Sequence, residues 1–162
     1  MLIREFAEAD WAQVWPIIRE IARAQDTFCY DPDLTPEQAR DLWLETAPGR
    51  TVVAVDDDGR VLGTAKSGPN RAGPGAHVST ASFMVAADAR GRGVGAALCE
   101  DTLSWARDEG YAGMQFNAVV ESNRSAIRLY ERLGFTIIGT VPGAFADPNL
   151  GRIGLHVMHC PF

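Results

Sequence analysis

Three glycines at alternating positions stand in the stretch VAADARGRGVGAALCE, where an apolar run gives way to a helical pattern. They are Gly91, Gly93 and Gly95, and Arg90 and Arg92 lie among them. Glycine lets the backbone approach a ligand without a Cβ atom in the way, and the first amides of a helix lack intrahelical partners and attract anions. The two guanidinium groups can reach flanking phosphate oxygens. The stretch therefore predicts a pyrophosphate cradle; the alternative is a tight strand-to-helix turn without a ligand.

Two other phosphate-binding motifs are alternative interpretations of this glycine loop. A P-loop is excluded because no Lys-Ser/Thr pair follows the glycines. Gly91, Gly93 and Ala96 do satisfy the dinucleotide pattern G-x-G-x-x-A, which favours NAD as an alternative ligand. That pattern needs an acid about 20 residues further on, where Phe116 and Asn117 stand instead. The loop also lies past mid-chain, which leaves too little sequence for a doubly wound sheet.

The elements that position the loop follow from the hydrophobic periodicity and from capping and turn residues. In chain order, we expect a strand at LIREF, a helix capped by Asp10, a helix from Thr35 and Pro36 to about Pro48, strands at TVVAV, VLGTAKS and AHVSTASFMV, a helix from the glycine loop to Gly110, a strand at GMQFNAVV, a helix from Ser122 and Asn123 to Gly134, and strands at FTIIGTV and IGLHVMH around the loop PGAFADPNLGR. This order predicts a mixed α/β fold.

Composition limits the class of protein. A chain of 162 residues with 46% hydrophobic and 22% charged residues is expected to fold as one domain spanning residues 1–162. A net charge of −6 provides no general attraction to nucleic acid or to an acidic membrane, so neither is expected as a partner. Cys29, Cys99 and Cys160 contain no CxxC pair, which favours buried thiols over a disulfide or zinc site. No signal-like segment is visible, and a cytoplasmic location is expected.

Two motifs resemble one family when taken together. Arg90-x-x-Gly93-x-Gly95 at the start of a helix resembles the coenzyme A signature of the Gcn5-related N-acetyltransferases (GNAT). The stretch NRSAIRLYERLGF, which begins at Asn123, resembles the second motif of that family. The resemblance covers essentially the whole chain. It implies a three-layer fold with splayed parallel central strands, in which acetyl-CoA is the cosubstrate and an amine is acetylated by direct transfer.

The same resemblance assigns the residues that hold the cosubstrate. A bulge in the strand SFMV is expected to splay that strand from QFNAV, with the pantetheine arm in the gap. The residues implied to bind acetyl-CoA are Phe83, Met84 and Val85 through their backbone, Arg90 and the segment Gly91, Arg92, Gly93, Val94, Gly95 and Ala96 around the pyrophosphate, and Asn123 and Tyr130 beside the arm. No metal is implied.

For catalysis, the resemblance places Tyr130 where it can protonate the leaving thiolate, with a backbone N–H of the bulged strand at the oxyanion. Without the flanking Asn123 and Leu133-Gly134-Phe135, the pattern would predict that Tyr130 is only a core aromatic residue on an amphipathic face. An amine substrate must also lose a proton, and AHVSTAS contains no carboxylate to accept it. The candidates for the base are His77, Glu121, or a water molecule held by Thr80 and Asn117.

The second half of the chain resembles more closely the yeast branch of the family that acetylates azetidine-2-carboxylate and related proline analogues. That resemblance places Asn117 in the acceptor site, and an asparagine in a strand expected to be buried needs hydrogen-bond partners. Phe28, Tyr30 and Phe145 are further candidates, as the wall of a small apolar pocket. The expected acceptor is a small amino or imino acid. Alternatives are an antibiotic-like amine, a protein N-terminus, or a non-catalytic acyl-CoA sensor; a homodimer is expected by resemblance.

Overall fold

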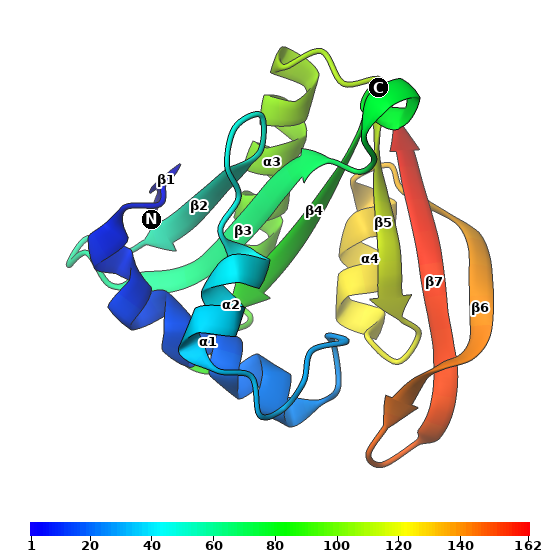
Figure 1. The fold of residues 1–162 in the computed structure, drawn as a ribbon, viewed down its shortest axis with the longest axis horizontal. Coiled ribbons are helices and arrows are strands. Elements are labelled where there is room, and N and C mark those ends of the chain that lie inside the picture. The colour runs from blue at the N-terminus through cyan, green and yellow to red at the C-terminus, as the bar shows by residue number, and fades with distance from the viewer.

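The computed structural model describes residues 1–162, and its elements follow the expected order (Figure 1). The strands and α-helices are β1 (Leu2–Glu5), α1 (Trp11–Ala24), α2 (Pro36–Trp43), β2 (Arg50–Val55), β3 (Val61–Pro69), β4 (Val78–Val85), α3 (Val94–Asp108), β5 (Gly113–Val120), α4 (Arg124–Arg132), β6 (Thr136–Asp147) and β7 (Gly151–Pro161). The predicted mixed α/β fold is therefore confirmed.

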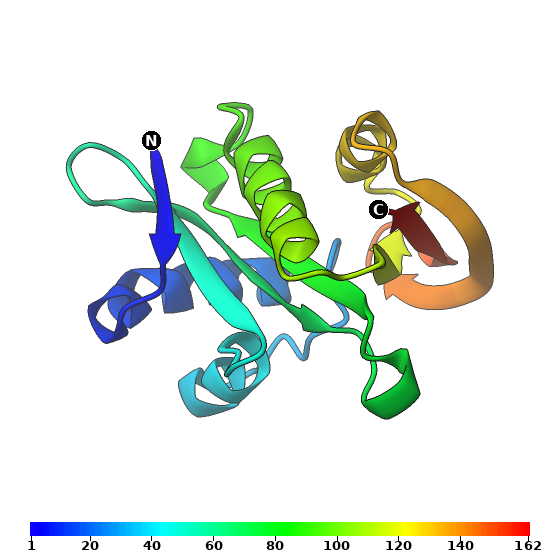
Figure 2. The ribbon, with the colours of Figure 1, turned by 90° about the horizontal axis from the view of Figure 1, so that it is seen from above.

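The seven strands form one sheet in the order β1-β2-β3-β4-β5-β7-β6. All neighbours are antiparallel except β4 and β5, which are parallel. Figure 2 shows α1 and α2 on one face of the sheet and α3 and α4 on the other, which gives three layers. Apolar side chains fill both interfaces: Ile18 and Trp43 pack with Met84 on the α1/α2 face, whereas Leu103 and Phe116 pack together on the α3/α4 face.

The central feature of the sheet is the separation of β4 from β5. The two strands pair only at their first residues, Val78 with Gly113 and Ser79 with Met114. The predicted bulge in β4 is wrong, since β4 keeps an unbroken register with β3. The register shift lies in β5 against β7, between Phe116 and Val119. Bulges bend the strand that carries them, and this one lies in the part of β5 that no longer pairs with β4.

The last hairpin and one cysteine also differ from expectation. Most of PGAFADPNLGR was predicted as loop, but β6 runs to Asp147 and β7 starts at Gly151. A register shift between Val141 and Phe145 accommodates the turn-forming residues within the strand.

Cys99 and Cys160 are buried as expected, whereas Cys29 is exposed in the loop after α1. None of the helices has the length and apolar character needed to cross a bilayer.

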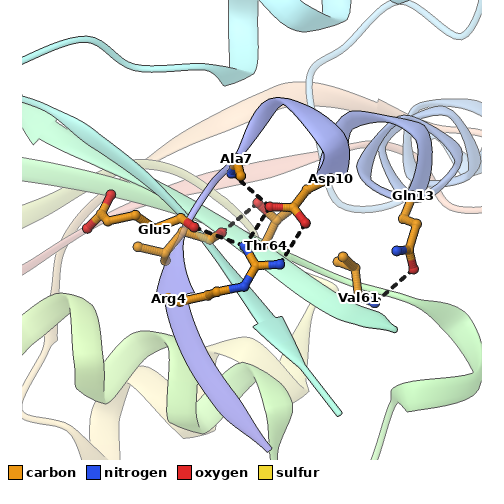
Figure 3. A network of polar contacts seen from close by, with 8 residues as sticks. Arg4, Glu5, Ala7, Asp10, Gln13, Val61 and Thr64 are labelled. Atoms are coloured by element: carbon orange, nitrogen blue, oxygen red, sulfur yellow. Dashed lines mark hydrogen bonds and ion pairs between the residues drawn. The ribbon is translucent and has the colours of Figure 1, made fainter. Parts of the chain in front are cut away.

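A buried carboxylate joins the first strand to the first helix (Figure 3). Asp10 was predicted to cap α1, but its side chain makes no cap hydrogen bond to that helix. It accepts the backbone N–H of Ala7 at 2.8 Å and both terminal nitrogens of Arg4 at 2.7 Å. These bonds, above all those from Arg4, hold the pKa of Asp10 below its ordinary value. The ion pair thereby fixes α1 against β1.

Asp10→Asn is expected to lower the free energy of unfolding by about 1–3 kcal/mol at pH 7, because the amide carries no charge and has only one oxygen to accept hydrogen bonds from Arg4. A lowered folded-state pKa contributes stability above the unfolded-state value of about 3.9, and this contribution is lost as the pH falls. The difference between wild type and variant in urea unfolding should therefore shrink below about pH 4. The exposed Asp58→Asn serves as control; equal stability of both variants would contradict the assignment.

Candidate active site

A cavity of about 650 Å³ opens where β4 and β5 separate. Every residue predicted to bind acetyl-CoA lines it, with the exception of Arg92, which is exposed outside it. The cavity is bounded by the end of β4, the glycine loop, the start of α3 and the first turns of α4. Two motifs about 30 residues apart in sequence thus share one cavity, as the resemblance implies.

The glycine loop has the geometry of an anion site. Gly91 and Gly93 adopt φ angles of 74° and 80°, and a Cβ atom added at either would meet nothing within 4 Å. None of the backbone amides from 91 to 96 donates a hydrogen bond to another backbone atom. They belong to the loop and to the first turn of α3, where the helix dipole is positive. The unpartnered donors and the free space together fit a pyrophosphate.

The edge of β4 that faces the gap provides further donors. Ala86 donates to Leu62 across the β3–β4 ladder, and the hydrogen-bonding direction alternates along an antiparallel strand. Met84, which stands opposite Thr64, therefore uses its backbone groups to pair with β3. The backbone groups of Phe83 and Val85 point to the gap instead. Of the three predicted pantetheine contacts, these two have backbone groups free for that role.

The cavity reaches both faces of the sheet. Asn123, Leu129 and Tyr130 line it from the α4 side, whereas Ile21 and Phe28 line it from the α1 side. Because helices α1 and α4 lie on opposite faces (Figure 2), the cavity passes through the gap between β4 and β5. A long thioester can therefore enter from one face and meet a second substrate that arrives from the other.

Asn123 forms the N-cap of α4, as predicted. Its Oδ1 accepts the backbone N–H of Ala126 at 3.3 Å and the hydroxyl of Ser125 at 3.1 Å. Asparagine is preferred at this position because it satisfies amides that the helix leaves unpaired. Since the oxygen is occupied, the Nδ2 group remains available as a donor at the cavity wall.

Tyr130 lies in an aromatic cluster and also borders the cavity. Its ring centroid is 4.5 Å from that of Phe116 and 6.3 Å from that of Phe83. Burial, and to a smaller degree the Cys99 thiol, raises the pKa of Tyr130 far above its ordinary value. The phenol therefore stays protonated across the physiological range and can act as a proton donor. It is both a core aromatic residue and a residue of the cavity wall, so its packing is compatible with the predicted role as an acid.

The geometry agrees with a comparison of the chain with known families. The model of the acetyltransferase (GNAT) family matches residues 15–135. The chain belongs to the GNAT acetyltransferase family. A GCN5-related N-acetyltransferase from Kribbella flavida, whose structure is solved, is 57% identical, with a TM-score of 0.97 over 99% of this chain and 97% of that one.

Two curated relatives match over shorter lengths. N-acetyltransferase aca1 of Schizosaccharomyces pombe is 33% identical over 73% of this GNAT chain and 63% of its own length. The L-methionine sulfoximine/L-methionine sulfone acetyltransferase of Pseudomonas aeruginosa is 35% identical over 64% of this chain and 62% of its own length. The chain thus spans less than two thirds of each of these relatives.

Two predicted bases do not reach the cavity of this acetyltransferase. His77 is exposed just before β4, seven residues from Met84, which is about 23 Å along an extended strand. The carboxylate of Glu121 accepts the backbone N–H of Gly154 at 2.8 Å, so it is directed to β7. Neither predicted base lines the cavity, and the sequence does not show which end of β4, or which side of β5, borders that cavity.

The remaining candidates, Thr80 and Asn117, line neither of the two cavities but lie on the α1/α2 face of the sheet. Asn117 is exposed rather than buried, on the face of β5 opposite Phe116. Thr80 shares that face, because Met84 on the same strand packs against α1 and α2. Both therefore lie on the same face of the sheet as Met84. No group of three or more potential metal ligands is found in the chain.

The three aromatic candidates line one smaller cavity. Phe28, Tyr30 and Phe145 surround a space of about 220 Å³, together with Cys29 and two alanines of β6. Burial, followed by the charges of Glu45 and Cys29, raises the pKa of Tyr30 to about 12. Phe28 also lines the large cavity, so the two spaces adjoin. The sequence therefore predicted the members of an apolar pocket drawn from distant parts of the chain.

Several cavity residues were not predicted. Asp26 and Thr27 follow α1, and Ser122, Ser125 and Leu129 surround the start of α4. Asp26 is the only carboxylate on the cavity wall. The left-handed conformation of the preceding Gln25, at φ 53°, turns the chain toward the cavity. No sequence signal marks that turn, because the residue in this conformation is not glycine.

Proposed function

We propose that this GNAT N-acetyltransferase transfers the acetyl group of acetyl-CoA to the amine of a small amino or imino acid, such as a proline analogue. The observation that carries the proposal is the cavity that crosses the sheet between β4 and β5. It joins an anion-binding loop on one face to a small apolar pocket on the other. The activity on amino acid derivatives named for the P. aeruginosa relative supports this class of acceptor.

The cosubstrate side of the site uses backbone groups above all. The amides from 91 to 96 bind the pyrophosphate, with Arg90 beside them. The backbone of Phe83 and Val85 and the Nδ2 group of Asn123 hold the pantetheine arm. Because these donors are fixed by the strand and by the helix cap, little reorganisation is needed when acetyl-CoA binds.

The transfer then proceeds in one step. The neutral amine attacks the thioester carbonyl, a backbone N–H of Phe83 or Val85 stabilises the oxyanion, and Tyr130 donates a proton as the thiolate leaves. Asp26 attracts the ammonium form of the acceptor, since it is the only acidic side chain on the wall. Before the attack, the ammonium loses its proton to bulk solvent by way of a water molecule that Thr80 and Asn117 hold.

The test is a panel of acceptors in which CoA release is measured and each product is identified by mass. The panel contains azetidine-2-carboxylate, proline, L-methionine sulfone, an aminoglycoside and a short peptide. We expect the amino and imino acids to exceed the other two classes by at least about tenfold in kcat/KM, which is about 1.4 kcal/mol in transition-state binding. Preference for the aminoglycoside or the peptide would overturn the acceptor class. Binding of acetyl-CoA without turnover of any acceptor would indicate a sensor.

A further inference from the structure

The turn between β5 and α4 carries two residues of the cavity wall, Ser122 and Asn123. Asn123 closes the turn by donating its backbone N–H to the Val120 carbonyl at 2.9 Å, and its side chain caps the helix that follows. These contacts lie within the turn and the two elements that it joins. They shape the turn, but they do not fix its position against the rest of the sheet.

Glu121 is the residue that ties this turn to β7. The β5–β7 ladder ends with Val120 opposite Leu155, and the next residues in this register are Glu121 and Gly154. The backbone N–H of Glu121 donates to the Gly154 carbonyl at 3.1 Å, and its carboxylate Oε2 accepts the Gly154 N–H at 2.8 Å. No other hydrogen bond connects residues 121–123 to an element besides β5 and α4.

The carboxylate takes the place of a backbone group in this pair. In an antiparallel ladder, the two residues of a hydrogen-bonded pair exchange both N–H···O bonds. Here the second bond goes to the carboxylate instead of the Glu121 carbonyl, so the pair is completed while the main chain already turns toward α4. A hydrogen bond to an ionised acceptor is roughly twice as strong as one between neutral groups. Glu121 therefore ends the ladder and anchors the turn at the same point.

Gly154 leaves the space that this carboxylate occupies. A Cβ atom added at Gly154 would overlap Oε2 of Glu121 and would lie 2.7 Å from Cγ2 of Thr140 on β6. The φ angle of Gly154 is not in the left-handed region, so space rather than backbone conformation favours glycine here. Any side chain at this position would displace the carboxylate from its bond.

We infer that Glu121 is a positioning residue for acetyl-CoA, which holds Asn123 where its Nδ2 group meets the pantetheine arm. The inference deepens the proposed function and rests on it for the contact between Asn123 and the arm. Glu121 acts through the turn, because its carboxylate is directed to β7 and does not line the cavity. Without the carboxylate, a single bond to Gly154 remains, and the turn can rotate about it and carry Asn123 away from the arm.

The test compares CoA with 3′-phospho-ADP, which is CoA without its pantetheine arm. Glu121→Ala should raise the dissociation constant of CoA by about tenfold and change that of 3′-phospho-ADP by less than about twofold, as measured by titration calorimetry. Both ligands carry the pyrophosphate that the glycine loop binds, and only CoA carries the arm that Asn123 contacts. A general loss of structure would weaken the binding of both.

Three further variants separate position from charge. Glu121→Gln keeps an oxygen that can accept the Gly154 N–H, so it should retain the affinity for CoA to within about threefold. Gly154→Ala displaces the carboxylate from the other side and should show the same CoA-specific loss as Glu121→Ala. Glu131→Ala removes a negative charge from the exposed face of α4, outside the cavity, and should leave both dissociation constants unchanged.

A double-mutant cycle tests the route through Asn123. Asn123→Ser keeps an oxygen that can cap α4 but removes the Nδ2 donor. When Glu121→Ala is added to Asn123→Ser, the affinity for CoA should fall by no more than about twofold further, because independent losses would multiply whereas coupled ones do not.

Wild-type affinity for CoA in Glu121→Ala overturns the inference, and so does an equal loss for CoA and 3′-phospho-ADP. Losses that multiply in the double variant overturn it as well. These measurements follow binding and do not depend on turnover, so a failure to acetylate any acceptor would overturn the proposed function alone.

Discussion

Tyr130→Phe is expected to lower kcat by about 100-fold, within the range for loss of a general acid, while the dissociation constant of acetyl-CoA stays unchanged. The substitution removes only the hydroxyl. The contacts of the ring with Phe83, Phe116 and Phe135 remain, so folding should be preserved. Steady-state kinetics with an active acceptor and calorimetry with acetyl-CoA provide the two readouts.

A control variant and a pH profile show whether a loss of kcat in Tyr130→Phe comes from the Tyr130 hydroxyl itself. Tyr111→Phe changes a tyrosine that packs on Trp105 outside the cavity, and it should leave kcat unaltered. Because the pKa of Tyr130 is raised, the wild-type rate should show no loss attributable to this phenol up to about pH 10. A Tyr130→Phe enzyme with the wild-type kcat would remove the hydroxyl from the mechanism.

Gly93→Val is expected to raise the dissociation constant of acetyl-CoA by about 100-fold. The residue has a φ of 80°, which β-branched side chains adopt only with strain, and its side chain would occupy the space that the pyrophosphate needs. Calorimetry measures the binding, and thermal unfolding measures the cost of the strain separately.

Gly59→Val is the matched control for this prediction. Gly59 has the same φ of 80° and the same open surroundings, but it lies in the turn between β2 and β3. Both variants should lose similar stability through strain, whereas only Gly93→Val should lose affinity for acetyl-CoA. An equal loss of affinity in the two variants would show that strain, rather than the loop, determines binding.

Local chemistry made the cosubstrate side of the site predictable from the sequence. The helix starts at Val94 and Arg124 are marked by a glycine and by a capping asparagine, and these caps are the features that place donors at the cavity. The order of the elements followed from periodicity because each helix and strand is amphipathic over its own length. The residues of the two motifs therefore line one cavity, as the sequence predicted.

The acceptor side was less predictable because it depends on tertiary geometry. His77 directly precedes β4 and Phe83 lies near the end of that strand, and only the place where β4 separates from β5 shows which end borders the cavity. The contact of Asn70 with Asn117 joins residues 47 positions apart and exists because the loop after β3 crosses toward β5. No periodicity or motif encodes such a contact.

Hydrogen exchange followed by mass spectrometry, with and without CoA, tests most directly where the cosubstrate binds. The amides from 91 to 96 have no backbone partners in the free protein, so they should exchange quickly and become protected when CoA binds. The account predicts protection in residues 83–96 and 122–130 and none in β6 (Thr136–Asp147). Unchanged exchange at 91–96 in the presence of saturating CoA would contradict it.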